Sequence, residues 1–215
     1  MRYPVIFFDL DGTLTDPTEG ITKSVQYALA KFGIATDLDQ LRSFIGPPLH
    51  HSFMAEYGFD EPTSRRAVEA YREYFGDRGI FQNRMFEGIP ELLQGLRRAG
   101  GALCVVTSKP TVYSEQIVRH FGLDAFFDAV IGPGLDLSNA EKATLVRRAM
   151  DRYAGHAPAG FVMVGDREHD IIGACANAID SVGVTYGAGS RQELTAASAT
   201  HIVDTLADLE ALLRG

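Results

Sequence analysis

Short apolar runs alternate along the chain with segments of helical periodicity. The runs are bounded by turn residues and predict buried strands at 4–8, 102–106, 129–131, 161–164 and 181–184. Apolar residues at helical spacing predict helices at 90–98, 111–121, 140–153, 170–177, 191–197 and 206–213. Buried strands that alternate with helices form parallel sheets covered on both faces. The pattern therefore predicts an α/β fold with a doubly wound, Rossmann-like and mostly parallel sheet.

One connection is far longer than an ordinary loop. About eighty residues separate the first strand from the helix at 90–98 and contain no strand-like run, whereas connections in compact domains have a median of about 4–6 residues. The segment instead shows helical patterns at 20–32, 38–45, 49–57 and 62–75. We therefore predict a core made of residues 1–16 and 85–215, and a helical cap of residues 17–84 inserted after the first strand.

The composition excludes several classes of function. The chain has 215 residues, of which 46% are hydrophobic and 22% charged, with a net charge of −8. An acidic surface repels nucleic acid and anionic membranes, and no stretch approaches the ~20 consecutive apolar residues of a membrane helix. We expect a cytoplasmic protein with neither nucleic acid nor a membrane as its partner. The sequence does not indicate an oligomeric state.

Acidic residues follow two of the predicted strands. Asp9 comes directly after the first strand and Asp11 two residues later, and Asp166 follows the run at 161–164. Asp170 lies four residues further on, on the same face as Asp166 if a helix begins there. The carboxyl ends of parallel strands share one edge of the sheet, where ligands bind. Carboxylates gathered there would repel one another by roughly 4 kcal/mol per pair at ~4 Å and an effective dielectric of ~20. A bound cation removes this repulsion, and an all-oxygen ligand set favours Mg²⁺.

A second group of residues is suited to an anion. Thr107, Ser108 and Lys109 follow the run at 102–106 and precede a predicted helix, whose N-terminal N–H groups attract phosphate. Lys142 lies in the first turn of another predicted helix, where the macrodipole disfavours a positive charge by about 0.3–1 kcal/mol. An ordinary helix cap and a solvated surface lysine would account for these residues singly. An anion bound between the two lysines would account for them together.

Together these residues resemble the four motifs of the haloacid dehalogenase-like (HAD) superfamily, in the order that the superfamily has. Residues 9–14 (DLDGTL) resemble the first motif, 107–110 (TSKP) the second, Lys142 the third and 164–170 (VGDREHD) the fourth. The resemblance spans the whole chain, because a cap between the first two motifs also belongs to the superfamily pattern.

Other positions are most similar to one branch of the superfamily, that of phosphoglycolate phosphatases and bacterial 5′-nucleotidase-like proteins. They are Asp16, Gly20, the stretch 46–48 (GPP) and TSKP. The chain departs from this branch after Lys142, where Ala143 stands in place of a common proline. Lys109 is the alternative candidate for the lysine of the third motif.

The resemblance implies a role for each residue. Asp9 would be the nucleophile that forms an aspartyl-phosphate, and Asp11 would be the general acid and base. Thr107 and Lys142 would stabilise the transferring phosphoryl group. The implied Mg²⁺ ligands are Asp9, Asp11 through its carbonyl, Asp166 and Asp170. The implied substrate contacts are Leu10, Gly12, Thr13, Ser108 and Lys109 in the core, and Lys23 and Gly46 in the cap.

The activity implied by the resemblance is that of a Mg²⁺-dependent phosphomonoesterase. Its substrate would be a small phosphorylated metabolite such as phosphoglycolate or a nucleoside 5′-monophosphate. A phosphomutase of the same superfamily and a phosphotyrosine phosphatase remain alternatives. Outside the enzymes, a phospho-acceptor signalling module also gathers acids, a threonine and a lysine at a sheet edge, but such modules are much shorter and have no cap. Haloacid dehalogenation is disfavoured, because Asp11 has no role in displacing halide. The sequence does not identify the physiological substrate.

Overall fold

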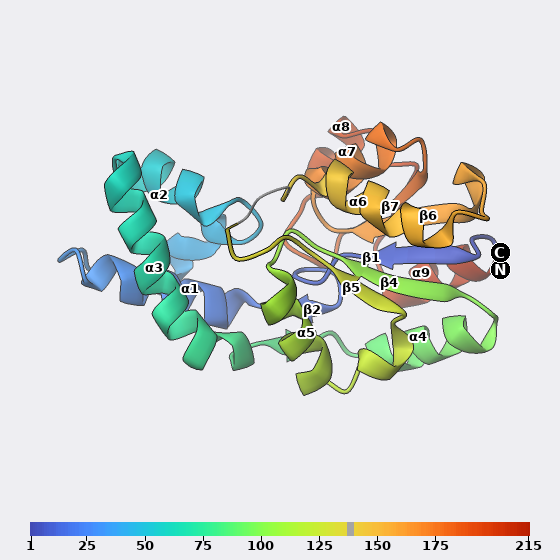
Figure 1. The fold of residues 1–215 in the computed structure, drawn as a ribbon, viewed down its shortest axis with the longest axis horizontal. Coiled ribbons are helices and arrows are strands. Elements are labelled where there is room, and N and C mark those ends of the chain that lie inside the picture. The colour runs from blue at the N-terminus through green and yellow to red at the C-terminus, as the bar shows by residue number, and fades with distance from the viewer. Residues whose placement is uncertain (137–139) are drawn as a thin grey trace. The chain divides into compact units, whose positions relative to one another are not determined.

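The computed structural model describes residues 1–136 and 140–215. Its central feature is a six-stranded parallel sheet with the order β5-β4-β1-β6-β7-β8 (Figure 1), which confirms the predicted α/β fold. The strands are β1 (Val5–Phe8), β4 (Ala102–Val106), β5 (Ala129–Ile131), β6 (Phe161–Gly165), β7 (Asp180–Val184) and β8 (His201–Val203). All five predicted strands are present. The pattern missed β8, because this three-residue edge strand is only half-buried and begins with a histidine.

The strand order reverses at β1. From β1 the sheet extends through β4 and β5 on one side, and the chain then returns to β6, which pairs with β1 on the other side. Phe8, the last residue of β1, is paired with both Val105 and Val164. The segments that follow β1, β4 and β6 therefore leave the sheet side by side, at the kind of switch point where open α/β sheets bind ligands.

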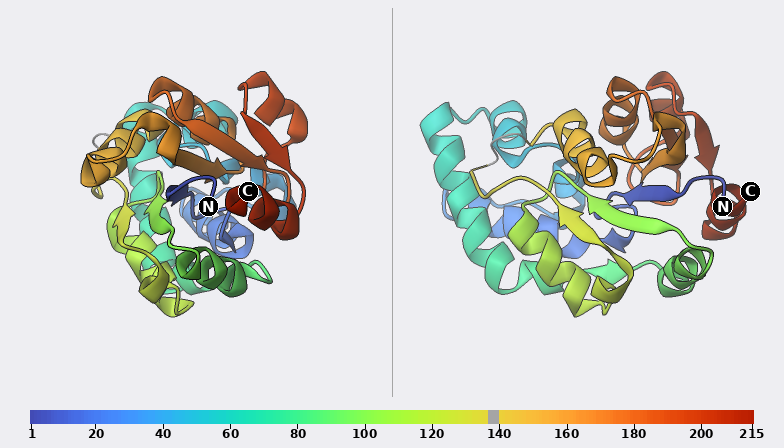
Figure 2. Two further views of the ribbon diagram at one scale, coloured as in Figure 1. Left: turned by 90° about the vertical axis from the view of Figure 1, so that its right-hand side faces the viewer. Right: turned by 45° about the vertical axis from the view of Figure 1, so that its right-hand side comes forward.

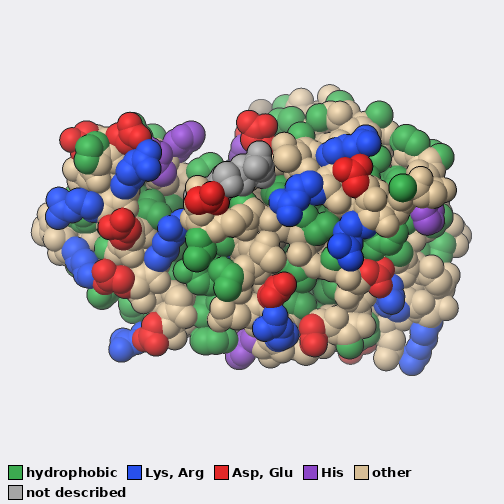
Figure 3. Space-filling view, viewed as in Figure 1, with side chains coloured by type: hydrophobic (Ala, Val, Ile, Leu, Met, Phe, Trp, Pro, Cys, Tyr) green, Lys and Arg blue, Asp and Glu red, His purple; other side chains and the backbone are tan. Residues whose placement is uncertain are grey.

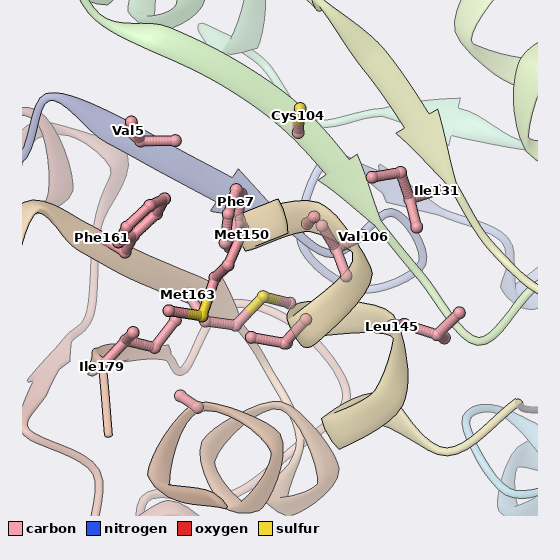
Figure 4. Packing of buried hydrophobic residues seen from close by; sticks show 13 residues of the cluster. Val5, Phe7, Cys104, Val106, Ile131, Leu145, Met150, Phe161, Met163 and Ile179 are labelled. Atoms are coloured by element: carbon pink, nitrogen blue, oxygen red, sulfur yellow. The ribbon is translucent and has the colours of Figure 1, made fainter. Parts of the chain in front are cut away.

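Helices cover both faces of the sheet, with α6 and α7 on one face and α4 and α5 on the other (Figures 1 and 2). The helices are α4 (Ile89–Arg98), α5 (Thr111–His120), α6 (Lys142–Met150), α7 (Glu168–Ala176), α8 (Arg191–Ala196) and α9 (Leu206–Arg214). Short 3-10 helices are η3 (Asp124–Phe126), η4 (Asp151–Tyr153) and η5 (Pro158–Gly160). Figure 4 shows the core next to α6, where Val5, Phe7 and Val106 from the strands pack with Leu145 and Met150.

Two helices that follow strands of the sheet begin two residues away from their predicted starts. The helix predicted at 140–153 begins at Lys142, and its last residues form η4. The helix predicted at 170–177 begins at Glu168. Asp166 therefore lies in the turn between β6 and α7, and the expectation that it shares a helix face with Asp170 is wrong.

Residues Asp16–Arg84 form a compact unit of their own, and Met1–Thr15 together with Met85–Gly215 form another. The smaller unit contains α1 (Thr18–Ala30), η1 (Leu38–Phe44), α2 (Leu49–Tyr57), α3 (Glu61–Asp77) and η2 (Gly79–Phe81). The Asp60 side chain caps α3 by accepting the Thr63 N–H at 2.9 Å, and α2 ends at Gly58 with a φ of 65°. The helix predicted at 38–45 has the tighter 3-10 geometry.

The chain enters and leaves the smaller unit through a two-stranded ribbon of β2 (Thr15–Asp16) and β3 (Arg84–Met85). The Arg84 guanidinium donates to Asp16 Oδ2 at 3.0 Å, and Asp16 Oδ1 accepts the Thr18 N–H at the start of α1. Gly20 is required next to η2, because a Cβ there would lie 2.0 Å from Gly79 O. Strands of two residues carry no periodicity, so the sequence pattern did not predict this ribbon.

The exterior carries charges of both signs. On the face seen in Figure 3, acidic and basic side chains are interspersed, and neither forms a continuous stripe. No helix within residues 1–136 or 140–215 has both the length and the apolar composition needed to cross a membrane. Because the net charge is −8, a site for an anion must be built from specific groups that act locally.

Candidate active site

Three carboxylates meet at the carboxyl ends of β1 and β6. Asp9 follows β1, Asp166 follows β6, and Asp170 lies in the first turn of α7. Each offers an oxygen atom, and these atoms all lie within 4.8 Å of one another. Asp166 and Asp170 are 1% exposed and Asp9 is 9% exposed. The sheet brings them together because β1 and β6 are neighbours, and the Asp9 N–H extends their pairing by donating to Val164 O at 2.9 Å.

This cluster has the oxygen ligands that a hard cation needs. Within the described residues, the buried Oδ1 atoms of Asp9 and Asp170 share a single ammonium group, that of Lys142. One positive charge does not balance three buried carboxylates, and buried charge that is not balanced is costly. Oxygen donors without sulfur or imidazole suit a hard divalent cation. The side chains of Asp9, Asp166 and Asp170 therefore fit a Mg²⁺ ion.

Lys142 supplies a buried positive charge beside the cluster. Its Nζ lies 3.0 Å from Asp9 Oδ1 and 2.7 Å from Asp170 Oδ1, and it donates to Val106 O at 3.0 Å. Burial opposes the charge, but the two carboxylates outweigh burial and raise the pKa of Lys142 above its usual value. Gly173 on α7 leaves room for this side chain, because a Cβ there would lie 2.7 Å from Lys142 Cγ.

The Asp11 carboxylate pairs with a different lysine. Lys109 Nζ lies 2.7 Å from Asp11 Oδ2, and both side chains are largely buried. Burial raises the pKa of Asp11 above its usual range, although the Lys109 ammonium opposes this shift. A carboxyl group with a raised pKa is suited to donating a proton. The two aspartates of the first loop therefore differ in environment, since Asp9 belongs to the carboxylate cluster and the Asp11 side chain does not.

The loop after β1 is packed against Asp166. Gly12 has a φ of 82° and lies so close that a Cβ would be 2.2 Å from Asp166 Oδ2, and the Thr13 hydroxyl donates to Asp166 Oδ1 at 3.4 Å. The Gly12 and Thr13 N–H groups donate to Thr15 O and Leu10 O, and the Leu10 side chain is fully buried. These groups hold the loop together. Substrate contact by Leu10, Gly12 and Thr13 stays a prediction.

The segment after β4 lies on the other side of β1. Thr107 is 2% exposed, and its Oγ1 accepts the Lys109 N–H at 3.3 Å. The Ser108 hydroxyl donates to Ala140 O at 3.4 Å. The structure thus brings Thr107, Ser108 and Lys109 to the same sheet edge as Asp9, and their binding of phosphate stays a prediction.

Two of the predicted substrate contacts belong to the smaller unit. Lys23 lies on α1, where its Nζ is 2.6 Å from Glu19 Oε1. Gly46 lies between η1 and α2 and has a φ of 105°. This backbone conformation favours glycine whether or not the residue touches a ligand. The roles of Lys23 and Gly46 therefore stay predictions.

The sequence pattern assigns no role in the site to the residues that follow β7. The Ala188 N–H donates to Asp166 Oδ2 at 2.8 Å, and the Tyr186 hydroxyl donates to Thr13 O at 3.1 Å. The signal in the sequence is a pair of glycines at 187 and 189. A Cβ at Gly189 would lie 1.8 Å from Asp166 O, so glycine is needed here for a close approach of two backbone segments.

The environment of Asp166 predicts how the stability of the metal-free protein depends on pH. Burial, together with the Asp170 and Asp9 carboxylates, raises the pKa of Asp166 from 3.8 to about 7. Between these two values the folded state keeps a proton that the unfolded state has lost. The contribution of Asp166 to the free energy of unfolding therefore falls as the pH rises through this window.

Asp166→Asn should remove this contribution. With a chelator present, we expect the free energy of unfolding of the variant to increase relative to wild type from about pH 4 to about pH 7 and then to level off. Urea denaturation of both proteins at a series of pH values measures the difference. A difference that stays constant across the window would contradict the raised pKa.

Comparison with known proteins gives matches over nearly the whole chain. A family model described as haloacid dehalogenase-like hydrolase matches residues 6–184. A 5′-nucleotidase of Pseudomonas aeruginosa is 50% identical over 99% of this chain and 96% of its own length. The tyrosine-protein kinase PtkA of Mycobacterium tuberculosis is 38% identical over 97% of this chain and 70% of its own length. The crystal structure of a predicted phosphatase from Clostridium acetobutylicum matches with a TM-score of 0.93 and 47% identity, covering 99% of both chains.

Proposed function

The chain belongs to the haloacid dehalogenase-like hydrolase family and is a phosphatase, a hydrolase of phosphoric monoesters, and we propose that it acts with Mg²⁺ on a small phosphorylated metabolite. The observation that carries this proposal is the position of Asp9, which belongs to a buried carboxylate cluster and lies beside Lys142. Similarity to a 5′-nucleotidase at 50% identity favours a nucleoside 5′-monophosphate over phosphoglycolate.

The proposed reaction has two steps that use two aspartates. In the first, an Asp9 oxygen attacks phosphorus, the bond from phosphorus to the leaving oxygen breaks, and Asp11 protonates that oxygen. In the second, the ionised Asp11 takes a proton from water, which attacks the aspartyl-phosphate, releases phosphate and restores the Asp9 carboxylate. Burial of Asp11 favours the protonated form for the first step, and Lys109 stabilises the ionised form for the second.

Charge neutralisation supports the first step, because a carboxylate and a phosphate group repel each other. The chain has four lysines, and Lys109 and Lys142 both lie at this sheet edge. We propose that Lys142 and the Thr107 hydroxyl contact the phosphoryl oxygens. A Mg²⁺ ion held by Asp9, Asp166, Asp170 and the Asp11 carbonyl would supply further positive charge to those oxygens.

We propose that residues 17–84 act as a cap that selects the leaving group. The core groups proposed above would contact only the phosphate, so they would not distinguish one small monoester from another. A unit that closes over the site adds contacts to the rest of the substrate and excludes water. Lys23 and Gly46 are the proposed contacts of this cap.

Phosphate release from a panel of monoesters tests the proposal. The panel contains nucleoside 5′-monophosphates, phosphoglycolate, sugar phosphates and a phosphotyrosine peptide, each assayed with Mg²⁺ and with excess EDTA. We expect release that depends on Mg²⁺ and is fastest, as kcat/KM, for a nucleoside 5′-monophosphate. Addition of excess Mg²⁺ after EDTA should restore the rate, which controls for damage by the chelator.

Three other outcomes would change the proposed cofactor, substrate or reaction. Release that is unaffected by EDTA would contradict the role of Mg²⁺. Preference for the phosphotyrosine peptide would replace the small metabolite by a protein substrate. An isomerised sugar phosphate formed without free phosphate would indicate a mutase.

A further inference from the structure

A segment that lies outside all four motifs contacts one carboxylate of the candidate metal site and the turn that leads to another. This segment follows β7 and runs from Tyr186 to Glu193, at the start of α8. It approaches both Asp166 and the turn that leads to Asp170. We refer to its two contacting groups, the Ala188 N–H and the Glu193 carboxylate, as the clamp.

The first group of the clamp, the Ala188 N–H, contacts Asp166 directly. The Ala188 N–H donates to Asp166 Oδ2 at 2.8 Å. The backbone packs closely enough that a Cβ at Gly187 would lie 2.2 Å from Gly12 O, and one at Gly189 would lie 1.8 Å from Asp166 O. One carboxylate oxygen of Asp166 is therefore bonded by this segment, while the other accepts the Thr13 hydroxyl. The two bonds together define the plane of the carboxylate.

The second group of the clamp, the Glu193 carboxylate, contacts the N-terminus of α7. Arg167 occupies the cap position of this helix, and a guanidinium group has no acceptor for the free N–H groups of a helix start. Glu193 supplies the acceptor from another helix. Its Oε1 accepts the Glu168 N–H at 2.9 Å and the Arg167 Nε–H at 2.7 Å. The Arg167 N–H in turn donates to Asp170 Oδ2 at 3.2 Å.

We propose that the Ala188 N–H and Glu193 form a positioning clamp that sets the orientation of the Asp166 and Asp170 carboxylates for the metal ion. The inference rests on the proposed function, because it assumes that the cluster binds Mg²⁺. Outer groups that orient metal ligands typically change metal affinity by about 10–100-fold when they are removed. Glu193 is a positioning residue and touches neither substrate nor metal.

Glu193 differs from an ordinary surface ion pair. Its side chain and that of Arg167 are 21% and 23% exposed, and the same oxygen also accepts a backbone N–H. Glu210 on α9 offers a matched control. It lies 2.7 Å from Arg214 in a more exposed pair on a helix that carries none of the site residues.

Titration calorimetry with Mg²⁺ alone tests the clamp in the full chain. We expect Glu193→Ala to weaken Mg²⁺ binding by about 10–100-fold, and Glu210→Ala to leave it unchanged. Glu193→Gln keeps an acceptor for the Glu168 N–H but loses the charge opposite Arg167, so we expect a smaller loss of about threefold. Saturating Mg²⁺ should restore most of kcat in the Glu193 variants, because the chemical groups are intact.

The outcomes separate the clamp from the proposed function. Wild-type protein that binds no Mg²⁺ would overturn the proposed cofactor and the clamp with it. Wild-type binding together with unchanged affinity in Glu193→Ala would overturn the clamp alone. If Glu193→Ala does not fold, unchanged affinity in folded Glu193→Gln overturns it. Equal weakening in Glu210→Ala would also overturn it, because the effect would then not depend on contact with α7.

Discussion

Asp9→Asn should lower the rate of phosphate release by at least about 10⁴-fold, as the loss of a nucleophile does in other covalent mechanisms. An amide does not attack phosphorus, and the substitution also removes one charged oxygen from the carboxylate cluster. The rate is measured with the preferred monoester at saturating Mg²⁺. Circular dichroism of the variant verifies that it is folded.

Two further measurements make this result specific to the nucleophile. After rapid quenching with a substrate labelled in its phosphate, wild-type protein should carry the label and Asp9→Asn should not. Asp151→Asn, which removes an exposed carboxylate paired with Arg147, should keep the wild-type rate. Substantial turnover by folded Asp9→Asn would refute the assignment of Asp9.

Lys142→Met should affect both stability and activity. Without the ammonium group, Asp9 and Asp170 remain buried and lose their positive neighbour. Removal of one partner of a buried ion pair costs about 3–5 kcal/mol in the free energy of unfolding. Removal of one charge or donor that stabilises a transition state typically lowers kcat by about 10²–10³-fold. Denaturation in the absence of metal measures the first effect, and phosphate release measures the second.

Lys31→Met is the matched control for this variant. Lys31 is exposed and pairs with Glu73 on the surface of the smaller unit, where an ion pair contributes about 0–1 kcal/mol. Added Mg²⁺ should recover part of the stability that Lys142→Met loses, because a cation at the cluster replaces some of the missing charge. Unchanged stability and activity in Lys142→Met would show that the lysine does not neutralise the cluster.

The candidate site could be located from the sequence because strand ends determine it. Asp9, Thr107 and Asp166 each come directly after a buried strand, and in a parallel sheet such positions meet at one edge. Lys142 was found through a different signal, a cation at a helix start. These signals are local in the sequence, although the contacts they predict are between distant residues.

Other parts of the site depend on contacts that no local pattern encodes. The pairing of Asp11 with Lys109, and the contacts of Ala188 and Glu193, follow from which strands and helices are neighbours in space. A single sequence marks such positions only by residue types that are common throughout proteins, such as a glycine in a loop or a glutamate on a helix. Strands of two or three residues, such as β2, β3 and β8, are too short to show a period.

The ribbon of β2 and β3 has a consequence for how the polypeptide reaches its native state. β1 lies between β4 and β6, so the first strand to be synthesised has no partner until the residues of the inserted unit have followed it. The entropy lost on closing a loop grows with the length of free chain between the segments that meet. Once the helices of the inserted unit have formed, Asp16 and Arg84 are joined, and the free chain between β1 and β4 is much shorter. The folded insertion thus lowers the entropy lost when β1 pairs with β4.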